Sequence, residues 1–228
     1  MNGIIASALA IVVGTLLGSL VKERLTKKLQ DTLFMAVGLA AFGIGIEYVV
    51  NNLSLSKYPV LFILSLAIGS VLGTWWDLQD RIDRLAYKYG KSNFLQGLVT
   101  VLLLYCIGAL AIVGPVVAAT RGDQEMLMTN AALDFVTGLI FGASFGWGMI
   151  IGAPVLFVWQ TSIFLIAKYL SAGFFSRPLI TELSIVGGFL IMTTGLNLLK
   201  IKDLKTLNLL PSLLIPIIFF IGLGIFGH

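Results

Sequence analysis

The chain has little of what soluble enzymes and most metalloproteins need. Its 228 residues include one cysteine, Cys106, and one histidine, His228. A single cysteine excludes an internal disulfide framework and a cysteine-based metal site. Charged residues make up only 11% of the chain, which is about half the usual share in globular domains. These shortages argue against a soluble domain.

Hydrophobic residues dominate instead. They account for 58% of the chain, and its mean hydropathy is +1.00. This composition predicts an integral membrane protein, in which crossings of about 20 residues leave room for about eight spans. We therefore predict an all-α polytopic transmembrane helical bundle forming one integral membrane domain over residues 1–228. The expected spans lie near residues 3–21, 30–50, 59–76, 94–118, 131–149, 153–170, 180–199 and 208–227.

The segment over residues 130–170 is too long for one crossing, because as a single helix it would measure about 60 Å. Gly152-Ala153-Pro154 is the expected turn that folds it into a hairpin. Gly138, Gly142 and Gly146 recur every four residues, which indicates a face of close helix packing. The other interpretation of these glycines is an unwound segment at a binding site.

Basic residues lie in short segments beside the spans, which argues against nucleic-acid binding and predicts orientation. With eight spans, Lys57, Arg121, Lys168 and Arg177 fall on one side, and the other eleven of the fifteen fall on the opposite side. Both termini are therefore expected on the non-cytoplasmic side. Seven crossings would split the fifteen as ten to five, so charge alone does not separate the two arrangements. Residues 77–93 are expected to form an interfacial amphipathic helix.

A weak internal repeat relates residues 29–47 to residues 179–197. The matching positions are Leu29, Leu33, Gly38 and Gly45 with Leu179, Leu183, Gly188 and Gly195, and Glu47 falls opposite Asn197. The two spans run in opposite directions, which is typical of inverted-repeat transporters, with repeats over about 1–76 and 130–228. Gly14 and Gly18 also match Gly142 and Gly146, but those spans run the same way. Either one match is chance, or residues 131–170 do not cross twice.

Several motifs resemble an uncharacterised bacterial membrane protein family. They are CIGALAIVGP (106–115), RGD (121–123), ALDF (132–135), PVLFVWQ (154–160), ITELSIVGG (180–188), TGLNLL (194–199) and NLLPSLLI (208–215). The chain is similar in these motifs to the YqgA/YdfK-like family (domain of unknown function 554). The resemblance implies that family's fold and a bacterial inner-membrane location, but no activity. It departs at Thr161, where the family often has glycine, so packing there is expected to differ.

Asp134 is the first candidate for a functional residue, because an ionised carboxylate at membrane depth is costly unless paired or facing a cavity. The structural alternative is that it lies about four residues inside the expected span. Thr129 or Asn130 would then cap that helix, and an acid would suit its dipole. Glu47, near a span end, is either a ligand or an acid at the level of the headgroups.

Three neutral polar residues complete the predicted substrate- or ion-binding set of Asp134, Gln160, Asn197, Glu47 and Thr194. Gln160 lies near the middle of its span, which favours a lined cavity. Asn197 fits better as a group that hydrogen-bonds between helices. Thr194 either supplies an oxygen to a cation or bonds its own helix backbone. No metal ligand set is assigned.

One catalytic motif occurs, and its context argues against it. Gly142 to Gly146 match G-x-S-x-G with Ser144 at the centre, but a nucleophile elbow needs a preceding strand and a histidine base. The motif lies in an apolar helical segment. We predict that the chain is not an enzyme and uses no cofactor.

Two functions remain open from the sequence. The first is a small-solute or ion transporter or channel with a polar cavity around Asp134 and Gln160. Its partners would be the lipid bilayer and a small solute or cation. The second is a non-transporting membrane protein that acts by packing with itself or another protein, with the glycines as the contact surface. Either function allows a homodimer.

Overall fold

The computed structural model describes residues 1–21, 26–81, 84, 98, 101–102, 104–106, 108–170, 176–202 and 204–226. Among these residues the regular elements are helices, and the prediction of a polytopic helical bundle is confirmed. Most of the interfacial segment expected at 77–93, the start of the span expected at 94–118, and His228 lie outside the described residues.

Ten helical elements are described. They are α1 (Asn2–Leu20), α2 (Lys27–Leu53), α3 (Leu61–Trp75), α6 (Ala109–Arg121), α7 (Glu125–Phe145), the 3₁₀ helix η1 (Trp147–Ile151), α8 (Gly152–Leu170), α9 (Arg177–Leu198), the 3₁₀ helix η2 (Thr206–Leu213) and α10 (Leu214–Phe226). In the described part, seven segments are long and apolar enough to cross a membrane, and α3 is a shorter apolar helix of 15 residues.

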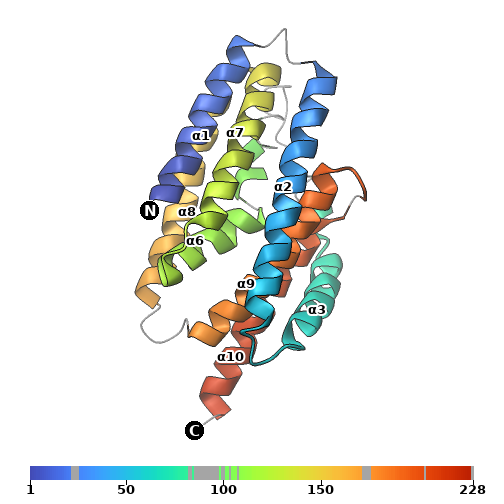
Figure 1. Cartoon of the computed structure of the whole chain (residues 1–228), viewed down its shortest axis with the longest axis vertical. Helices are drawn as coiled ribbons and strands as arrows, with labels where there is room; N and C mark the ends of the chain where they lie inside the picture. The colour runs from blue at the N-terminus through green and yellow to red at the C-terminus, as the bar shows by residue number, and fades with distance from the viewer. Residues whose placement is uncertain are drawn as a thin grey trace.

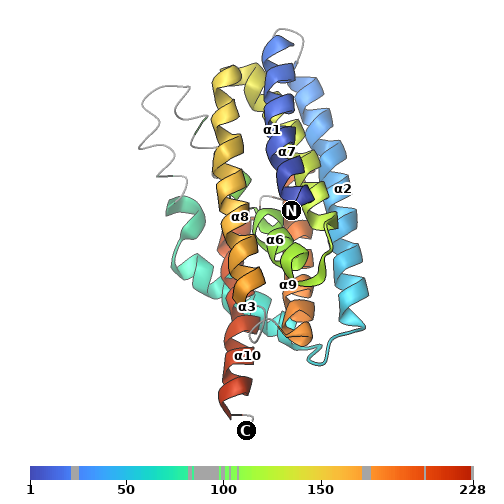
Figure 2. The same cartoon turned by 90° about the vertical axis from the view of Figure 1, so that its left-hand side faces the viewer.

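The helices pack in pairs that are distant in sequence. α1 lies along α7, α2 lies along α9, and α3 packs against η2 (Figure 1). α8 packs against α6 and α1, so the short helix α6 lies inside the bundle (Figure 2). The chain thus forms one half around α1, α7 and α8 and another around α2, α9 and α3.

Glycines bring α1 and α7 into backbone contact. A Cβ at Gly14 or Gly18 would overlap the carbonyl oxygen of Phe135 or Leu139, and one at Gly142 would overlap that of Thr15. From one contact to the next the residue number rises on both helices, so α1 and α7 run parallel. Close approach of this kind is what small residues permit in membranes, where lipid is as apolar as leucine.

A second glycine seam joins α2 and α9. Gly38 lies against the backbone of Gly195, and Gly45 lies against that of Gly188. From one contact to the next the residue number rises on α2 and falls on α9, so these helices run antiparallel. The two helices also begin alike, because the Thr26 and Ser176 side chains each cap a helix start by accepting the N–H three residues on.

The hairpin is present, but its turn is not where the sequence predicted. α7 ends at Phe145, and Gly146 breaks the helix with φ +88°. Such a backbone angle is unstrained for glycine. Gly152 and Pro154 instead form the first turn of α8, where a proline lacks only an N–H that has no helical partner. Proline in the sequence thus marked a helix start rather than the turn itself.

Candidate functional site

Asp134 lies deeper in its helix than the sequence predicted. α7 begins at Glu125 with Gln124 as its N-cap, so residues 125–130 are helical and not a loop. Asp134 is therefore nine residues, or about 13 Å, beyond the helix start. The interpretation of Asp134 as a first-turn acid capped by Thr129 or Asn130 is wrong, because the helix dipole acts within the first turn.

The carboxyl group of Asp134 is enclosed between α7 and α1. Its side chain is 4% exposed, and its Oδ2 accepts a hydrogen bond of 2.6 Å from Asn130 Nδ2. The same Nδ2 lies 3.5 Å from Ser7 Oγ, and Ser7 donates to the carbonyl oxygen of Leu127. Among the described residues, no lysine or arginine forms an ion pair with Asp134. The carboxyl group is thus held by neutral groups alone.

Gln160 on α8 is the most unusual polar residue of the interior. Its side chain is fully buried, and neither amide atom has a hydrogen-bond partner within the described part of the chain. Native proteins rarely bury an amide without partners, because each unsatisfied polar atom costs about 1–3 kcal/mol. An amide with no partner among the described residues is therefore a candidate position for a bound solute, ion or water.

Helical register places Gln160 at the same height along the bundle as the hydrogen-bonded residues Asp134, Asn130 and Ser7. Leu156, one turn before it, packs with Ile11 of α1, and Phe164, one turn after it, packs with Ile4. Ser7 lies between Ile4 and Ile11 on α1. Gln160 therefore faces the interior at the height where Ser7 contacts Asn130 of α7.

Two further features lie at this height. Tyr105 packs in the cluster of Leu156, and its buried hydroxyl has no described partner. α6 passes the same level with Pro115, which has no N–H to offer the carbonyl of Ala111. α6 stays helical through Pro115, so this level combines unpartnered polar side-chain atoms with one backbone carbonyl that lacks its helical donor.

Asn197 does not join this group. Its Nδ2 donates to the carbonyl of Leu204 at 2.6 Å and to Thr206 Oγ1 at 2.8 Å, and its Oδ1 accepts from the Leu204 N–H at 2.8 Å. It thus holds the turn that follows α9. Thr194 donates to the carbonyl of Leu190 within its own helix. Both residues have structural roles in the other half of the bundle.

Glu47 also lies apart from the interior group. It is exposed on α2, and its Oε1 accepts a bond of 3.4 Å from Asn51 one turn on. This position matches the interpretation as an acid at the level of the headgroups. Of the five predicted residues, the fold therefore brings Asp134 and Gln160 to one level and leaves Asn197, Glu47 and Thr194 elsewhere.

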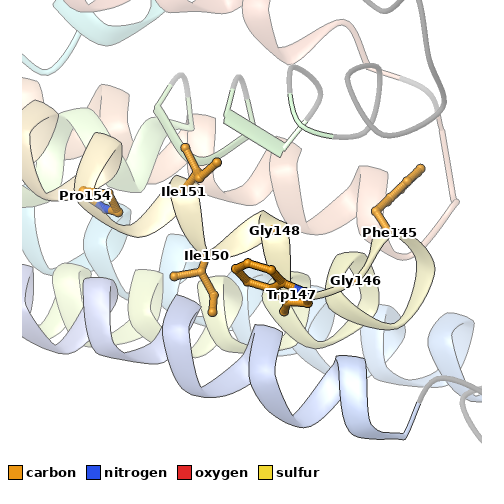
Figure 3. Close-up of a pocket in the computed structure, with 7 residues that line it drawn as sticks. All are labelled: Phe145, Gly146, Trp147, Gly148, Ile150, Ile151 and Pro154. Atoms are coloured by element: carbon orange, nitrogen blue, oxygen red, sulfur yellow. The ribbon is translucent and has the colours of Figure 1, made fainter.

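A hollow of about 660 Å³ lies at the turn between α7 and α8, away from the polar residues. Phe145, Trp147, Ile150, Ile151 and Pro154 line it together with Gly146 and Gly148 (Figure 3). None of the five predicted residues lines it. Its lining is almost wholly apolar, so it offers nothing that would select a polar solute. In this conformation the Asp134–Gln160 level is enclosed.

A polar network at one end of the bundle was missed by the sequence reasoning. Arg121, at the end of α6, donates to Asn52 Oδ1 at 2.7 Å and to Thr181 Oγ1 at 2.8 Å, and Tyr48 donates to Asp123 at 2.9 Å. The ends of α2 and α6 and the start of α9 thus meet. The RGD motif was the available signal, but its partners lie 60 or more residues away.

Glu182 is a further polar residue that was not predicted from the sequence. It is fully buried on α9, whereas Glu47, the acid chosen from the sequence, is exposed. Both acids occur in apolar stretches near a helix end, so hydropathy alone does not distinguish them. No cluster of three or more histidine, cysteine, aspartate or glutamate side chains that would hold a metal ion occurs in the described ranges.

Comparisons with known proteins agree with a membrane location. A family model described as "Protein of unknown function (DUF554)" matches residues 2–221. The chain is 45% identical over 227 residues to the uncharacterized membrane protein YdfK of Bacillus subtilis (strain 168), covering 100% of this chain and 99% of that protein. It is 28% identical over 217 residues to the uncharacterized protein YqgA of Escherichia coli (strain K12), covering 92% of each. No solved structure matches the chain.

Proposed function

Because the chain belongs to the DUF554 family of membrane proteins, we propose its function from its interior: it carries a small solute or ion across the bacterial cytoplasmic membrane. The solute would bind at the level of Asp134 and Gln160, between α1, α6, α7 and α8. The observation that carries the proposal is the buried amide of Gln160, whose two polar atoms have no partner in the described part of the chain.

The charges around this level restrict the solute. Asp134 contributes one carboxyl group, and Gln160, Tyr105 and Ser7 contribute neutral groups. In a low-dielectric interior, an unbalanced charge is strongly unfavourable. A singly positive ion, a proton or a small neutral molecule therefore suits the site, whereas an anion or a divalent cation would leave a net charge there.

Alternating access follows from the proposed inverted repeat. Ser176 follows Thr26 by 150 residues, and α8 and α9 begin 150 residues after α1 and α2. With this offset, Gly38 corresponds to Gly188 and Gly45 corresponds to Gly195. The repeat therefore predicts that a Gly45–Gly188 contact accompanies the Gly38–Gly195 contact, and both contacts are present. Helices α1 and α7 run parallel, so an inverted repeat does not relate them. We therefore attribute the match of Gly14 and Gly18 with Gly142 and Gly146 to helix packing alone. Rocking of the repeats would open the enclosed level to each side in turn.

The distribution of basic residues supports the proposed orientation. Lys200 pairs with Asp31 at 2.7 Å, which places the start of α2 and the end of α9 at one end of the bundle. That end also carries Lys27, Lys28 and Lys202, and it is the proposed cytoplasmic end. Both termini would then lie on the opposite, non-cytoplasmic side.

The alternative, a non-transporting protein that acts by helix packing, loses part of its basis. Its argument was that the glycine faces serve association with another chain. Gly14, Gly18, Gly142, Gly38 and Gly45 instead contact helices of this same chain. The glycine pattern is thereby accounted for without a partner.

A ligand screen tests the proposal. Thermal unfolding of the purified protein would be followed with monovalent and divalent cations, anions, amino acids and a pH series, in wild type, Asp134→Asn and Gln160→Leu. A ligand at a hundred times its dissociation constant adds about 2.7 kcal/mol to the free energy of unfolding. The matched control is Ser162→Ala, since Ser162 is exposed on α8 and bonds only its own helix.

We expect one solute class to raise the unfolding temperature of the wild type and the control but of neither site variant. The same solute should then enter proteoliposomes that contain the wild type. Ligand shifts that persist in both site variants, or stabilisation without uptake, would contradict the proposal. A stoichiometric protein partner with no solute effect would favour the packing alternative.

A further inference from the structure

Glu182 has surroundings that the proposed transport site does not explain. It is the sixth residue of α9, and its side chain is fully buried. Ser56 Oγ donates to its Oε1 at 2.5 Å, while Oε2 has no hydrogen-bond partner among the residues described. The Tyr58 N–H donates in turn to Ser56 Oγ at 3.0 Å. One carboxyl group is thus half bonded and wholly shielded from solvent.

No cation neutralises this carboxyl group in the described part of the chain. The charged groups near this end of the surrounding elements are Arg177 on α9, Lys57 in the connection between α2 and α3, Glu47 near the end of α2, Arg121 at the end of α6 and Asp123 just after it. Arg121 bonds Asn52 and Thr181, Asp123 bonds Tyr48, and Lys57 and Arg177 are exposed. The described residues of α3 and α10 carry no charge.

The residues around Glu182 suit a proton better than a metal ion. A sodium-sized or larger ion needs several oxygen ligands, and Ser56 Oγ is the one other side-chain oxygen recorded in contact with this carboxyl group among the described residues. A proton needs only the carboxyl oxygen. It also removes the charge that burial makes unfavourable.

The carboxyl group also links two separate elements of the fold. Ser56 lies in the connection between α2 and α3, residues 54–60, and Glu182 lies on α9. The same connection places the Tyr58 ring against Phe219 and Phe220 of α10, with ring centroids 5.0 and 5.7 Å apart. Lifting this connection would break the Ser56–Glu182 bond and admit water to the carboxyl group.

We propose that Glu182 and Ser56 form a proton-binding latch that closes the α2–α3 connection onto α9. When the latch is closed, Glu182 carries a proton and accepts the Ser56 hydroxyl. When it opens, the carboxyl group meets water and releases that one proton. The latch stands on its own geometry and does not require that the Asp134 level transports a solute.

Hydrogen–deuterium exchange tests the latch in the purified full-length protein. The amides of residues 54–60 report it, because the Ser56–Glu182 bond holds this connection against α9 when the latch is closed. After correction for the intrinsic effect of pH on exchange, protection of residues 54–60 should fall about tenfold per pH unit across the titration. That slope is the one for release of a single proton. The Glu182→Gln variant keeps a neutral acceptor for Ser56 and should show protection independent of pH.

A matched control and a second measurement keep the test decisive. Glu47→Gln removes an exposed carboxylate from α2 and should keep the wild-type pH profile. Infrared spectra should contain a protonated-carboxyl stretch that Glu182→Gln abolishes. A pH profile unchanged in Glu182→Gln, or an unchanged carboxyl band, would overturn the proposal. Protection that follows sodium concentration at fixed pH would replace the proton by a metal ion.

Discussion

The two halves of the bundle use glycines in the same way and polar side chains in opposite ways. The half around α1, α7 and α8 holds Asp134 and Gln160 in its middle, and the amide of Gln160 is unbonded among the described residues. The half around α2 and α9 has bonded amides at its ends, Asn52 at one and Asn197 at the other, although the Glu182 Oε2 atom of this half has no described partner. Glycine seams therefore report packing in both halves, whereas the amides differ between the halves in position and in bonding.

The largest effect is expected where the comparison depends on close packing. Gly45→Leu places a side chain against the backbone of Gly188 and should lower the free energy of unfolding by about 3 kcal/mol or more. Gly43, two residues away on α2, has open space around it, so Gly43→Leu should be nearly neutral. Detergent unfolding of both variants measures the difference. Equal losses in the two would show that the seam contributes nothing specific.

The amide of Asn197 should matter for stability alone. Asn197→Ala removes three hydrogen bonds from the turn after α9 and should cost about 2 kcal/mol. Thr194→Val, which removes only a bond within the helix, should cost under about 0.5 kcal/mol. Thermal unfolding with and without the solute class that stabilises the wild type measures both. Loss of the ligand shift in Asn197→Ala would return this residue to the site.

Gln160 should behave in the opposite way. Gln160→Met has a similar volume and removes two unsatisfied polar atoms, so the free energy of unfolding should stay level or rise by about 1 kcal/mol. Ligand-induced stabilisation should disappear at the same time. A destabilised Gln160→Met variant would mean that the amide is bonded in solution, and the contrast with Asn197 would then fail.

The smallest effect is expected at an exposed ion pair. The hydrogen bond from Lys205, at 2.8 Å, lowers the pKa of Asp80 below its ordinary value of 3.8. A lowered pKa stabilises the folded state above pH 3.8, and that contribution is lost as the pH falls through the folded pKa. Asp80→Asn should therefore change the unfolding temperature slightly at pH 7 and not at all near pH 2. A large change at pH 7 would mean that the pair does more than an exposed ion pair normally does.

The sequence predicted the membrane class, the multi-pass bundle and the packing face that includes Gly138 and Gly142, because composition and small-residue spacing carry that information directly. It also singled out Asp134 and Gln160. It misplaced the hairpin turn, because Gly146 and Pro154 are both compatible with a break and only the backbone angle distinguishes them.

The partners of individual polar residues were not predictable from the sequence. Glu47 and Glu182 have similar local sequence, yet one faces outward and the other is fully buried, since helix rotation is decided by contacts far along the chain. Asn197 was expected to hydrogen-bond between helices, whereas its partners, Leu204 and Thr206, belong to the turn after α9 and the start of η2 and depend on the path of that turn. Spacing identifies a face of a helix, and only the fold identifies what covers it.

The parallel pairing of α1 with α7 has a consequence for biosynthesis. α1 ends at Leu20 and its partner begins at Glu125, so about a hundred residues separate them. At about 5–20 residues per second, the ribosome needs roughly 5–20 s to make that stretch. During this time the glycine face of α1 has no partner from its own chain. Helix α1 must therefore wait in the membrane, or beside an insertion factor, until α7 has been synthesised.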